Sequence, residues 1–118
     1  MRNPKRSLRL RLWDILNAVA TARLAIGDLS LDAFRSDAIR KLAAERCIEI
    51  ISEAARHVPP ESQSNASDIP WRQIIGIGNI LRHGYEDIDP EIIWKLVRDD
   101  LGPLEDAIRR IVADLGDR

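Results

Sequence analysis

Hydrophobic residues recur along the chain at helical rather than strand spacing. From Ser7 to about Ile26 they form one stripe that repeats every three or four positions: Leu8, Leu12, Ile15, Leu16, Val19, Ala22 and Ile26. This spacing places the side chains on one face of an α-helix. Gly27 and Asp28 follow the stripe, and glycine tolerates the left-handed conformation common at helix ends. The pattern therefore predicts a first helix that ends at Ile26.

A second helix is predicted from about Leu31 to His57. Ser30 is a suitable N-cap, because its hydroxyl can accept a hydrogen bond from a free backbone N–H of the first turn. Pro59 and Pro60 cannot continue the helix. The apolar residues of this segment cover more than one face, so we expect it to be the central helix, packed on two sides.

Turn and cap residues divide the second half of the chain. Residues 59–68 (PPESQSNASD) are rich in Pro, Ser, Asn and Asp and predict a loop. A third helix is expected from about Pro70 to His83, with Ile80 among its core residues. After a turn at 84–87, Asp89-Pro90 has the pattern of an N-cap followed by proline at the first helical position.

The end of the chain completes a helical bundle. Gly102-Pro103 is expected to break or kink the fourth helix before a last one. We therefore predict an all-α, up-and-down bundle of four to five helices, in a single domain over residues 1–118. Residues 1–7 are basic and are expected to be flexible.

Composition narrows the functional classes. Hydrophobic residues make up 45% and charged residues 31% of 118, which suits one folded domain and argues against wholesale disorder. Lys and Arg number 18 against 19 Asp and Glu, which excludes a globally basic nucleic-acid binder but allows a local basic patch. With one cysteine, Cys47, and two histidines, we expect no disulfide, metal or other cofactor. No stretch of about 20 uncharged residues occurs, so a cytoplasmic protein is expected.

One stretch, residues 79–87 (NILRHGYED), combines titratable, aromatic and flexible groups. His83 ends the predicted third helix, and Asn79 lies one turn earlier on the same face. An imidazole is the natural general acid or base near neutral pH. Taken alone, the pattern favours a simpler interpretation, in which the helix dipole stabilises a histidine near the C-terminal end.

Five short motifs together resemble the HepT-like proteins, in the same order and spacing over residues 8–115. They are residues 12–16 (LWDIL), 51–55 (ISEAA), 69–74 (IPWRQI), 79–85 (NILRHGY) and 93–94 (IW). HepT-like proteins are small HEPN-domain ribonuclease toxins of prokaryotic toxin–antitoxin pairs. The resemblance implies a helical homodimer whose antitoxin is an MntA-like nucleotidyltransferase, encoded beside it.

The family's motif is commonly written R-N-x-x-x-H-x-Y. Asn79, His83 and Tyr85 match their places in it, whereas Gly78 stands in place of the arginine. The resemblance implies that Arg and His from two subunits line a dimer cleft and cleave RNA (tRNA or mRNA) without metal. In that chemistry the guanidinium holds the phosphate and the imidazole moves the proton of the 2′-hydroxyl or of the leaving group.

Two arginines could replace the missing guanidinium. Arg82 is adjacent to His83, so on a straight helix it points about 100° away within one subunit, an objection that weakens across a two-fold axis. Arg72 lies about 16 Å from His83 along the helix axis, which is too far for a local pair unless the partner subunit supplies it. Arg82 is therefore included with His83 and Asn79 among the candidate catalytic residues.

Two further positions take their roles from the resemblance. It implies that the antitoxin attaches AMP to Tyr85 (AMPylation), which neutralises the toxin. Glu53 matches an acidic position in the family's E-A-A stretch and is a candidate for supporting the cleft, with a solvated or helix-pairing glutamate as the alternative.

Two functions remain open from the sequence. In the first, the chain is a ribonuclease toxin that acts through His83. In the second, Gly78 leaves it catalytically impaired, as a helical binding partner of the nucleotidyltransferase.

Overall fold

A computed structural model describes residues 4–84 and 88–116, with side chains for 8–83 and 88–115. Every regular element in these ranges is helical, which confirms the all-α prediction. The longer helices are α1 (Pro4–Ile26), α3 (Ala38–Ala55), α5 (Trp71–Gly84) and α7 (Leu101–Gly116). The shorter ones are α2 (Leu31–Arg35), α4 (Pro60–Ser64), α6 (Pro90–Lys95) and the π-helical η2 (Leu96–Asp100). The four longer helices fit the expected bundle, and the short helices come in addition to it.

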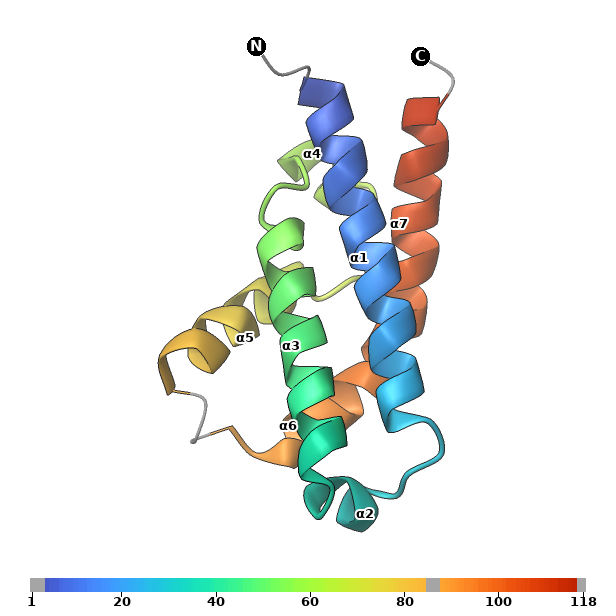
Figure 1. Cartoon of the computed structure of the whole chain (residues 1–118). Coiled ribbons are helices and arrows are strands. Elements are labelled where there is room, and N and C mark those ends of the chain that lie inside the picture. Colours follow the sequence, from blue (N-terminus) through green and yellow to red (C-terminus); the bar gives the residue numbers. More distant parts are fainter. Residues whose placement is uncertain (1–3, 85–87, 117–118) are drawn as a thin grey trace.

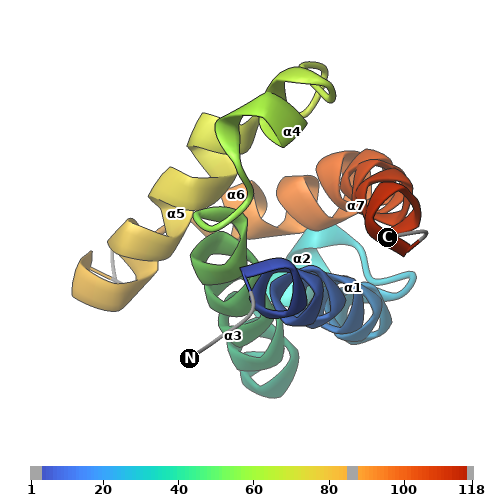
Figure 2. The same ribbon diagram turned by 90° about the horizontal axis from the view of Figure 1, so that it is seen from above.

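The bundle leaves the end of α5 at the edge of the molecule. In Figure 1, α1 runs antiparallel to both α3 and α7. Helix α3 packs against α1 on one side and α5 on the other, as expected for the central helix. Figures 1 and 2 both show α5 diverging from α7 and projecting to the side. Its C-terminal turns, which carry the sequence motif, are therefore open to solvent on one face.

The first predicted helix is confirmed, and the second is wrong as a single element. Gly27 has φ of +49° and ends α1 in the left-handed conformation, as expected. Helix α1 already begins at Pro4, within the segment expected to be flexible. The segment from Leu31 to His57 is divided at Ser36-Asp37. The extended Asp37 accepts a hydrogen bond from the backbone N–H of Arg40 at 3.0 Å, and so caps a new helix, α3.

Later boundaries depend on proline. The short helix α4, with Pro60 at its first position, occupies part of the segment predicted as a loop. Asp89 caps α6 as predicted, because its carboxylate accepts from the Glu91 N–H at 2.9 Å. The break or kink expected at Gly102-Pro103 lies two residues earlier: the π-helical η2 ends at Asp100, and both residues lie in the first turn of α7, where proline is tolerated. The separate last helix is present and begins at Leu101.

The core lies between the longer helices. It includes Ile15 and Val19 of α1, Ile48 and Ile51 of α3, and Ile108 of α7, all fully buried. Cys47 is buried as well, and burial raises the pKa of its thiol. Ile80, which is expected in the core, is instead exposed over 53% of its surface. In the described part of the chain, no helix has the length and apolar character needed to cross a membrane.

Candidate functional site

The motif residues lie on the exposed part of the last turns of α5. Asn79, Arg82 and His83 are exposed, whereas Leu81 between them is buried. His83 makes no hydrogen bond or ion pair with another described residue. Tyr85, the proposed modification site, lies outside the described residues. The imidazole of His83 thus lies on the exposed surface of α5.

Gly78, at the place of the motif arginine, is buried where α5 crosses α3. A Cβ at this position would lie 2.0 Å from the Oγ atom and 2.4 Å from the Cβ atom of Ser52. Ser52 is fully buried, and its hydroxyl donates to the carbonyl of Ile75 at 2.7 Å. Since real Cβ atoms do not approach so closely, the helix crossing requires glycine at residue 78. An arginine cannot occupy this position without separating the two helices.

The guanidinium nearest to the motif histidine in sequence belongs to Arg82, which is held by two groups. It donates to the side-chain oxygen of Asn79 on the same helix and lies 3.8 Å from a carboxylate oxygen of Glu53 on α3. Glu53 also lies 3.4 Å from Nε2 of His57 and 3.9 Å from Arg56. The structure therefore brings Asn79, Arg82 and Glu53 together. Because these side chains are one-third or more exposed, the pairs orient Arg82 more than they stabilise the fold.

Helix geometry places Asn79 between Arg82 and His83. At about 100° per residue, Asn79 is turned about 60° from Arg82 and about 40° from His83. The three side chains thus share one broad exposed face, although Arg82 and His83 diverge within one subunit. Arg72 lies at the opposite end of α5 and does not join them.

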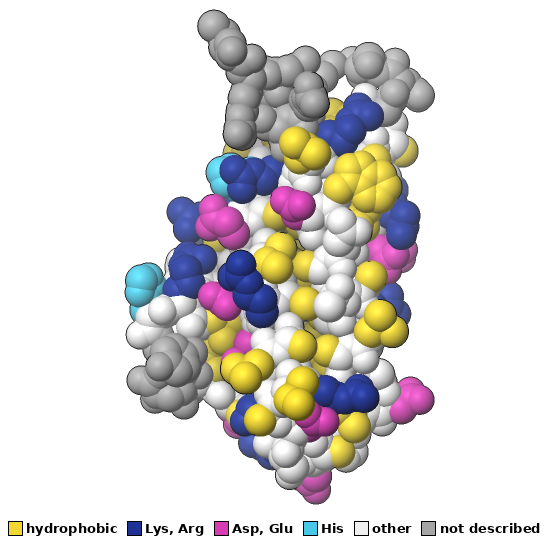
Figure 3. Space-filling model, viewed as in Figure 1, with side chains coloured by type: hydrophobic (Ala, Val, Ile, Leu, Met, Phe, Trp, Pro, Cys, Tyr) yellow, Lys and Arg dark blue, Asp and Glu magenta, His cyan; other side chains and the backbone are white. Residues whose placement is uncertain are grey.

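A pocket of about 390 Å³ lies beside Arg82, between α1, α3 and α5. We call it the charged pocket, because arginines and carboxylates of all three helices line it: Arg11, Asp14, Arg46, Glu49, Glu53 and Arg82, with Ile50 and Ala54 between them. Figure 3 shows basic and acidic side chains close together on the face where α1 and α3 lie in front. Arg11 and Arg46 are not predicted from the sequence as members of one pocket. Their helical spacing from Asp14 and Glu49 is visible in the sequence, but the pairing of the helices is not.

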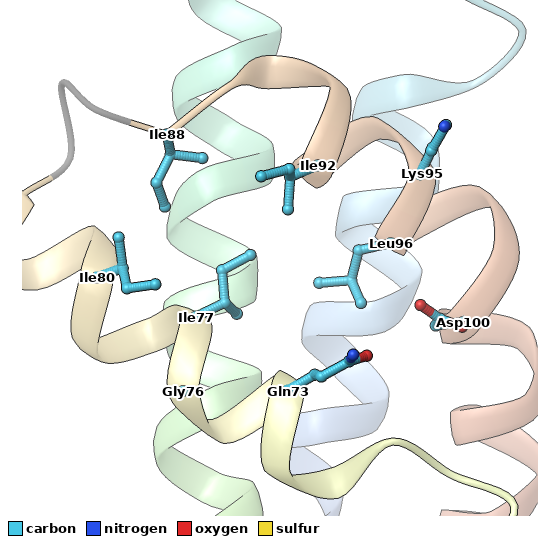
Figure 4. A pocket seen from close by; sticks show the side chains of 9 residues that line it. All are labelled: Gln73, Gly76, Ile77, Ile80, Ile88, Ile92, Lys95, Leu96 and Asp100. Atoms are coloured by element: carbon cyan, nitrogen blue, oxygen red, sulfur yellow. The ribbon is translucent and has the colours of Figure 1, made fainter.

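A second, larger hollow of about 620 Å³ follows the other side of α5. This apolar groove separates α5 from α6 and η2 (Figure 4), and is lined by Gln73, Gly76, Ile77, Ile80, Ile88, Ile92, Lys95, Leu96 and Asp100. Ile80 and Ile92 are each 53% exposed. Burial, with a smaller contribution from Asp99, raises the pKa of Asp100 at one end of the groove. Ile80 is turned only about 60° from His83 around α5, so the groove adjoins the exposed imidazole.

Neither hollow has the arrangement of side chains that a metal ion needs, as far as the described residues show. Within the described ranges, no group of three or more His, Cys, Asp or Glu side chains is placed to hold a metal ion. Glu49 and Glu53 both line the charged pocket, but Glu53 already contacts two arginines and a histidine. The described side chains at this site offer guanidinium, imidazole, amide and carboxylate groups.

Comparison with known proteins identifies the family. The model of a family described as "Ribonuclease HepT-like" matches residues 15–111. "Putative RNase MJ1380" of Methanocaldococcus jannaschii is 31% identical over 97 residues, which cover 82% of this chain and 89% of the relative. "Probable ribonuclease HepT" of Thermococcus cleftensis is 28% identical over 107 residues, 91% and 97% of the two chains. "Putative RNase MJ0125" of Methanocaldococcus jannaschii is 25% identical over 115 residues, 98% and 99% of the two chains. No solved structure matches the chain. The chain belongs to the HepT-like ribonuclease family.

Proposed function

We propose that the chain is a metal-independent endoribonuclease and the toxin of a toxin–antitoxin pair, with His83 as general acid or base and Arg82 as the phosphate-binding guanidinium. One observation carries this proposal. Position 78 is closed by Ser52, while Arg82 is held by Asn79 and Glu53 on the exposed part of the same helix end. In this proposal Arg82 takes the part of the motif arginine, and Asn79 and His83 keep their places in the motif.

The proposed reaction uses the 2′-hydroxyl of the substrate as nucleophile. His83 takes the proton of this hydroxyl, and the 2′-oxygen of the RNA then attacks the adjacent phosphorus. The bond from phosphorus to the 5′-oxygen breaks, which leaves a 2′,3′-cyclic phosphate, and the departing oxygen takes up a proton. Arg82 donates to the phosphate oxygens, where negative charge increases in the transition state.

A homodimer would supply the geometry that one subunit lacks. Arg82 and His83 diverge by about 100° on one helix, so they reach one phosphate more easily from two copies. The apolar groove supports this assembly, because the exposed Ile80 and Ile92 that line it form a surface that a second copy would bury. The cleft between the copies would then contain both catalytic groups.

Fractionation by size combined with an RNA cleavage assay tests the dimer and the activity together. Purified chain is separated by size exclusion, and each fraction is incubated with tRNA or mRNA in EDTA. We expect the dimer fraction to cleave the unmodified RNA. It should not cleave the same RNA with 2′-O-methyl groups, because methylation removes the nucleophilic hydroxyl. Cleavage confined to monomer fractions would contradict the dimer, and a folded dimer that leaves RNA intact would contradict the ribonuclease.

A second candidate function follows from Gly78. Because the fold excludes an arginine at this position, the chain could also be a catalytically impaired helical partner of the nucleotidyltransferase. The absence of RNA cleavage by a correctly assembled dimer that still binds the nucleotidyltransferase would favour this second function.

Tyr85 is the proposed site of control by an MntA-like nucleotidyltransferase. The support is the family resemblance together with its place two residues after the exposed His83. Phosphate added there would repel an RNA backbone near the imidazole. Because RNA and the nucleotide donor are both present in the cytoplasm, we propose that the pair acts there.

Intact-mass measurement tests the modification. The chain is incubated with ATP and the nucleotidyltransferase encoded beside it. We expect a mass increase by one or more AMP groups in the unaltered chain and none in Tyr85→Phe. An equal increase in Tyr85→Phe would place the modification elsewhere, and no increase in either chain would contradict AMPylation.

A further inference from the structure

We infer that the charged pocket binds one unpaired nucleotide of the RNA, next to the nucleotide at which the chain is cleaved, and that it favours bases with an amino group. In this arrangement Arg11 and Arg46 contact the phosphate, while Asp14 and Glu49 accept hydrogen bonds from the base. The inference rests on the proposed ribonuclease function, because it gives that site its substrate contacts.

The position of the pocket connects it to the catalytic residues. Arg82 lines it, and the next residue along α5 is His83. Because the two side chains diverge by about 100°, a group in the pocket lies beside the imidazole and not against it. A volume of about 390 Å³ is within the range of small-ligand pockets. The pocket therefore suits a nucleotide that flanks the cleaved bond.

The charges of the pocket fit a nucleotide better than a phosphate alone. Three arginines and three carboxylates line it, so their formal charges cancel. A groove that followed only the RNA backbone would have an excess of positive charge. A nucleotide has an anionic phosphate at one end and hydrogen-bond donors on its base at the other. Both kinds of lining group are thus matched by one ligand.

Four of the six charged groups are available to such a ligand. Glu53 and Arg82 contact each other, and Glu53 also contacts Arg56 and His57. By contrast, Arg11, Asp14, Arg46 and Glu49 make no ion pair with any residue in the described ranges. The half-buried Ile50 and the buried Ala54 lie between them and offer an apolar surface to the base.

The carboxylates predict which bases are preferred. Acidic side chains accept hydrogen bonds from the amino groups of cytosine and guanine, and single-stranded RNA exposes these base edges. Uracil has no amino group, and its single N3–H donor lies between two carbonyl oxygens, which a carboxylate repels. The arginines bind phosphate whatever the base. Loss of an arginine should therefore weaken all RNA binding, whereas loss of a carboxylate should change only the preference.

Binding to the His83→Gln chain tests the inference without cleavage. Fluorescence anisotropy is measured with labelled decamers of cytidine and of uridine at one salt concentration. We expect the cytidine decamer to bind about tenfold more tightly. Arg46→Gln should weaken both about tenfold, and Glu49→Ala should remove the preference. Arg110→Gln, on an exposed part of α7, serves as the control and should change neither.

The outcomes separate this inference from the proposed function. Equal binding by Arg46→Gln and Arg110→Gln would overturn the pocket as an RNA site, even if the unaltered chain cleaves RNA. A cytidine preference that survives Glu49→Ala and Asp14→Ala would overturn the role of the carboxylates. Conversely, the expected binding pattern in a chain that cleaves no RNA would support the nucleotide pocket and contradict the ribonuclease.

Discussion

Replacement of Gly78 by arginine, the residue of the family motif, is expected to destabilise the protein and to leave RNA cleavage no faster. The first atom of the new side chain would overlap Ser52, since a Cβ at residue 78 lies 2.0 Å from its Oγ atom. Helices α3 and α5 would have to separate, which would break the Ser52–Ile75 hydrogen bond and displace the motif. If the crossing of α3 and α5 were open at residue 78, the same substitution would instead add a catalytic guanidinium and increase the rate of RNA cleavage.

Gly78→Ala measures the cost of the first atom alone. Overpacking of a well-packed core costs about 1–3 kcal/mol, so the melting temperature should fall by about 4–12 °C. Gly76→Ala is the matched control on the same helix, because a Cβ there meets nothing within 4 Å. It should leave stability unchanged or raise it by up to about 1 kcal/mol.

A double variant identifies Ser52 as the cause. Ser52→Gly removes both atoms that the new Cβ would meet, so the combined loss of stability with Gly78→Ala should be smaller than the sum of the single losses. Equal melting temperatures for Gly78→Ala and Gly76→Ala would contradict the close packing. Simple additivity in the double variant would show that the strain does not arise at Ser52.

Arg82→Gln is expected to lower the rate of RNA cleavage by about 10²–10³, the usual cost of losing a positioned donor to the transition state. The melting temperature should change little, because the pair with Glu53 is half exposed and contributes at most about 1 kcal/mol. Arg82→Lys should retain part of the rate, since an ammonium keeps the charge without the planar fork of donors.

Arg72→Gln is the matched control for this prediction. It removes an exposed arginine from the same helix, about 16 Å from His83 along the axis. We expect its cleavage rate to equal that of the unaltered chain. Equal rates for Arg82→Gln and the unaltered chain, or equal losses in both arginine variants, would contradict the specific role of Arg82.

Local chemistry was sufficient to predict some of the fold. Gly27 ends α1, and Asp89 caps α6, because each feature depends on residues within one turn of the boundary. The break at Ser36-Asp37 could not be predicted in the same way. An aspartate suits the exposed face of a continuous helix as well as the cap of a new one, and only the packing of α2 and α3 decides between them.

The features of the candidate site that lie within the single helix α5 could be predicted from the sequence, whereas the contacts between helices could not. Spacing alone puts Asn79 and His83 one turn apart on the exposed part of α5. The contact of Gly78 with Ser52 and the presence of Arg11 and Arg46 in the charged pocket depend on which helices lie side by side. A periodic pattern contains no such information. The same reason explains Ile80, which has core spacing but lines an open groove.

The most direct test of the proposed function compares initial rates of RNA cleavage by the unaltered chain and by His83→Gln in EDTA, with matched protein concentrations and the same RNA. We predict metal-independent cleavage by the unaltered chain and a rate about 10²–10⁴ lower for His83→Gln, the range expected for loss of a general acid or base. Equal rates in the two proteins, or intact RNA in both, would contradict a ribonuclease that acts through His83.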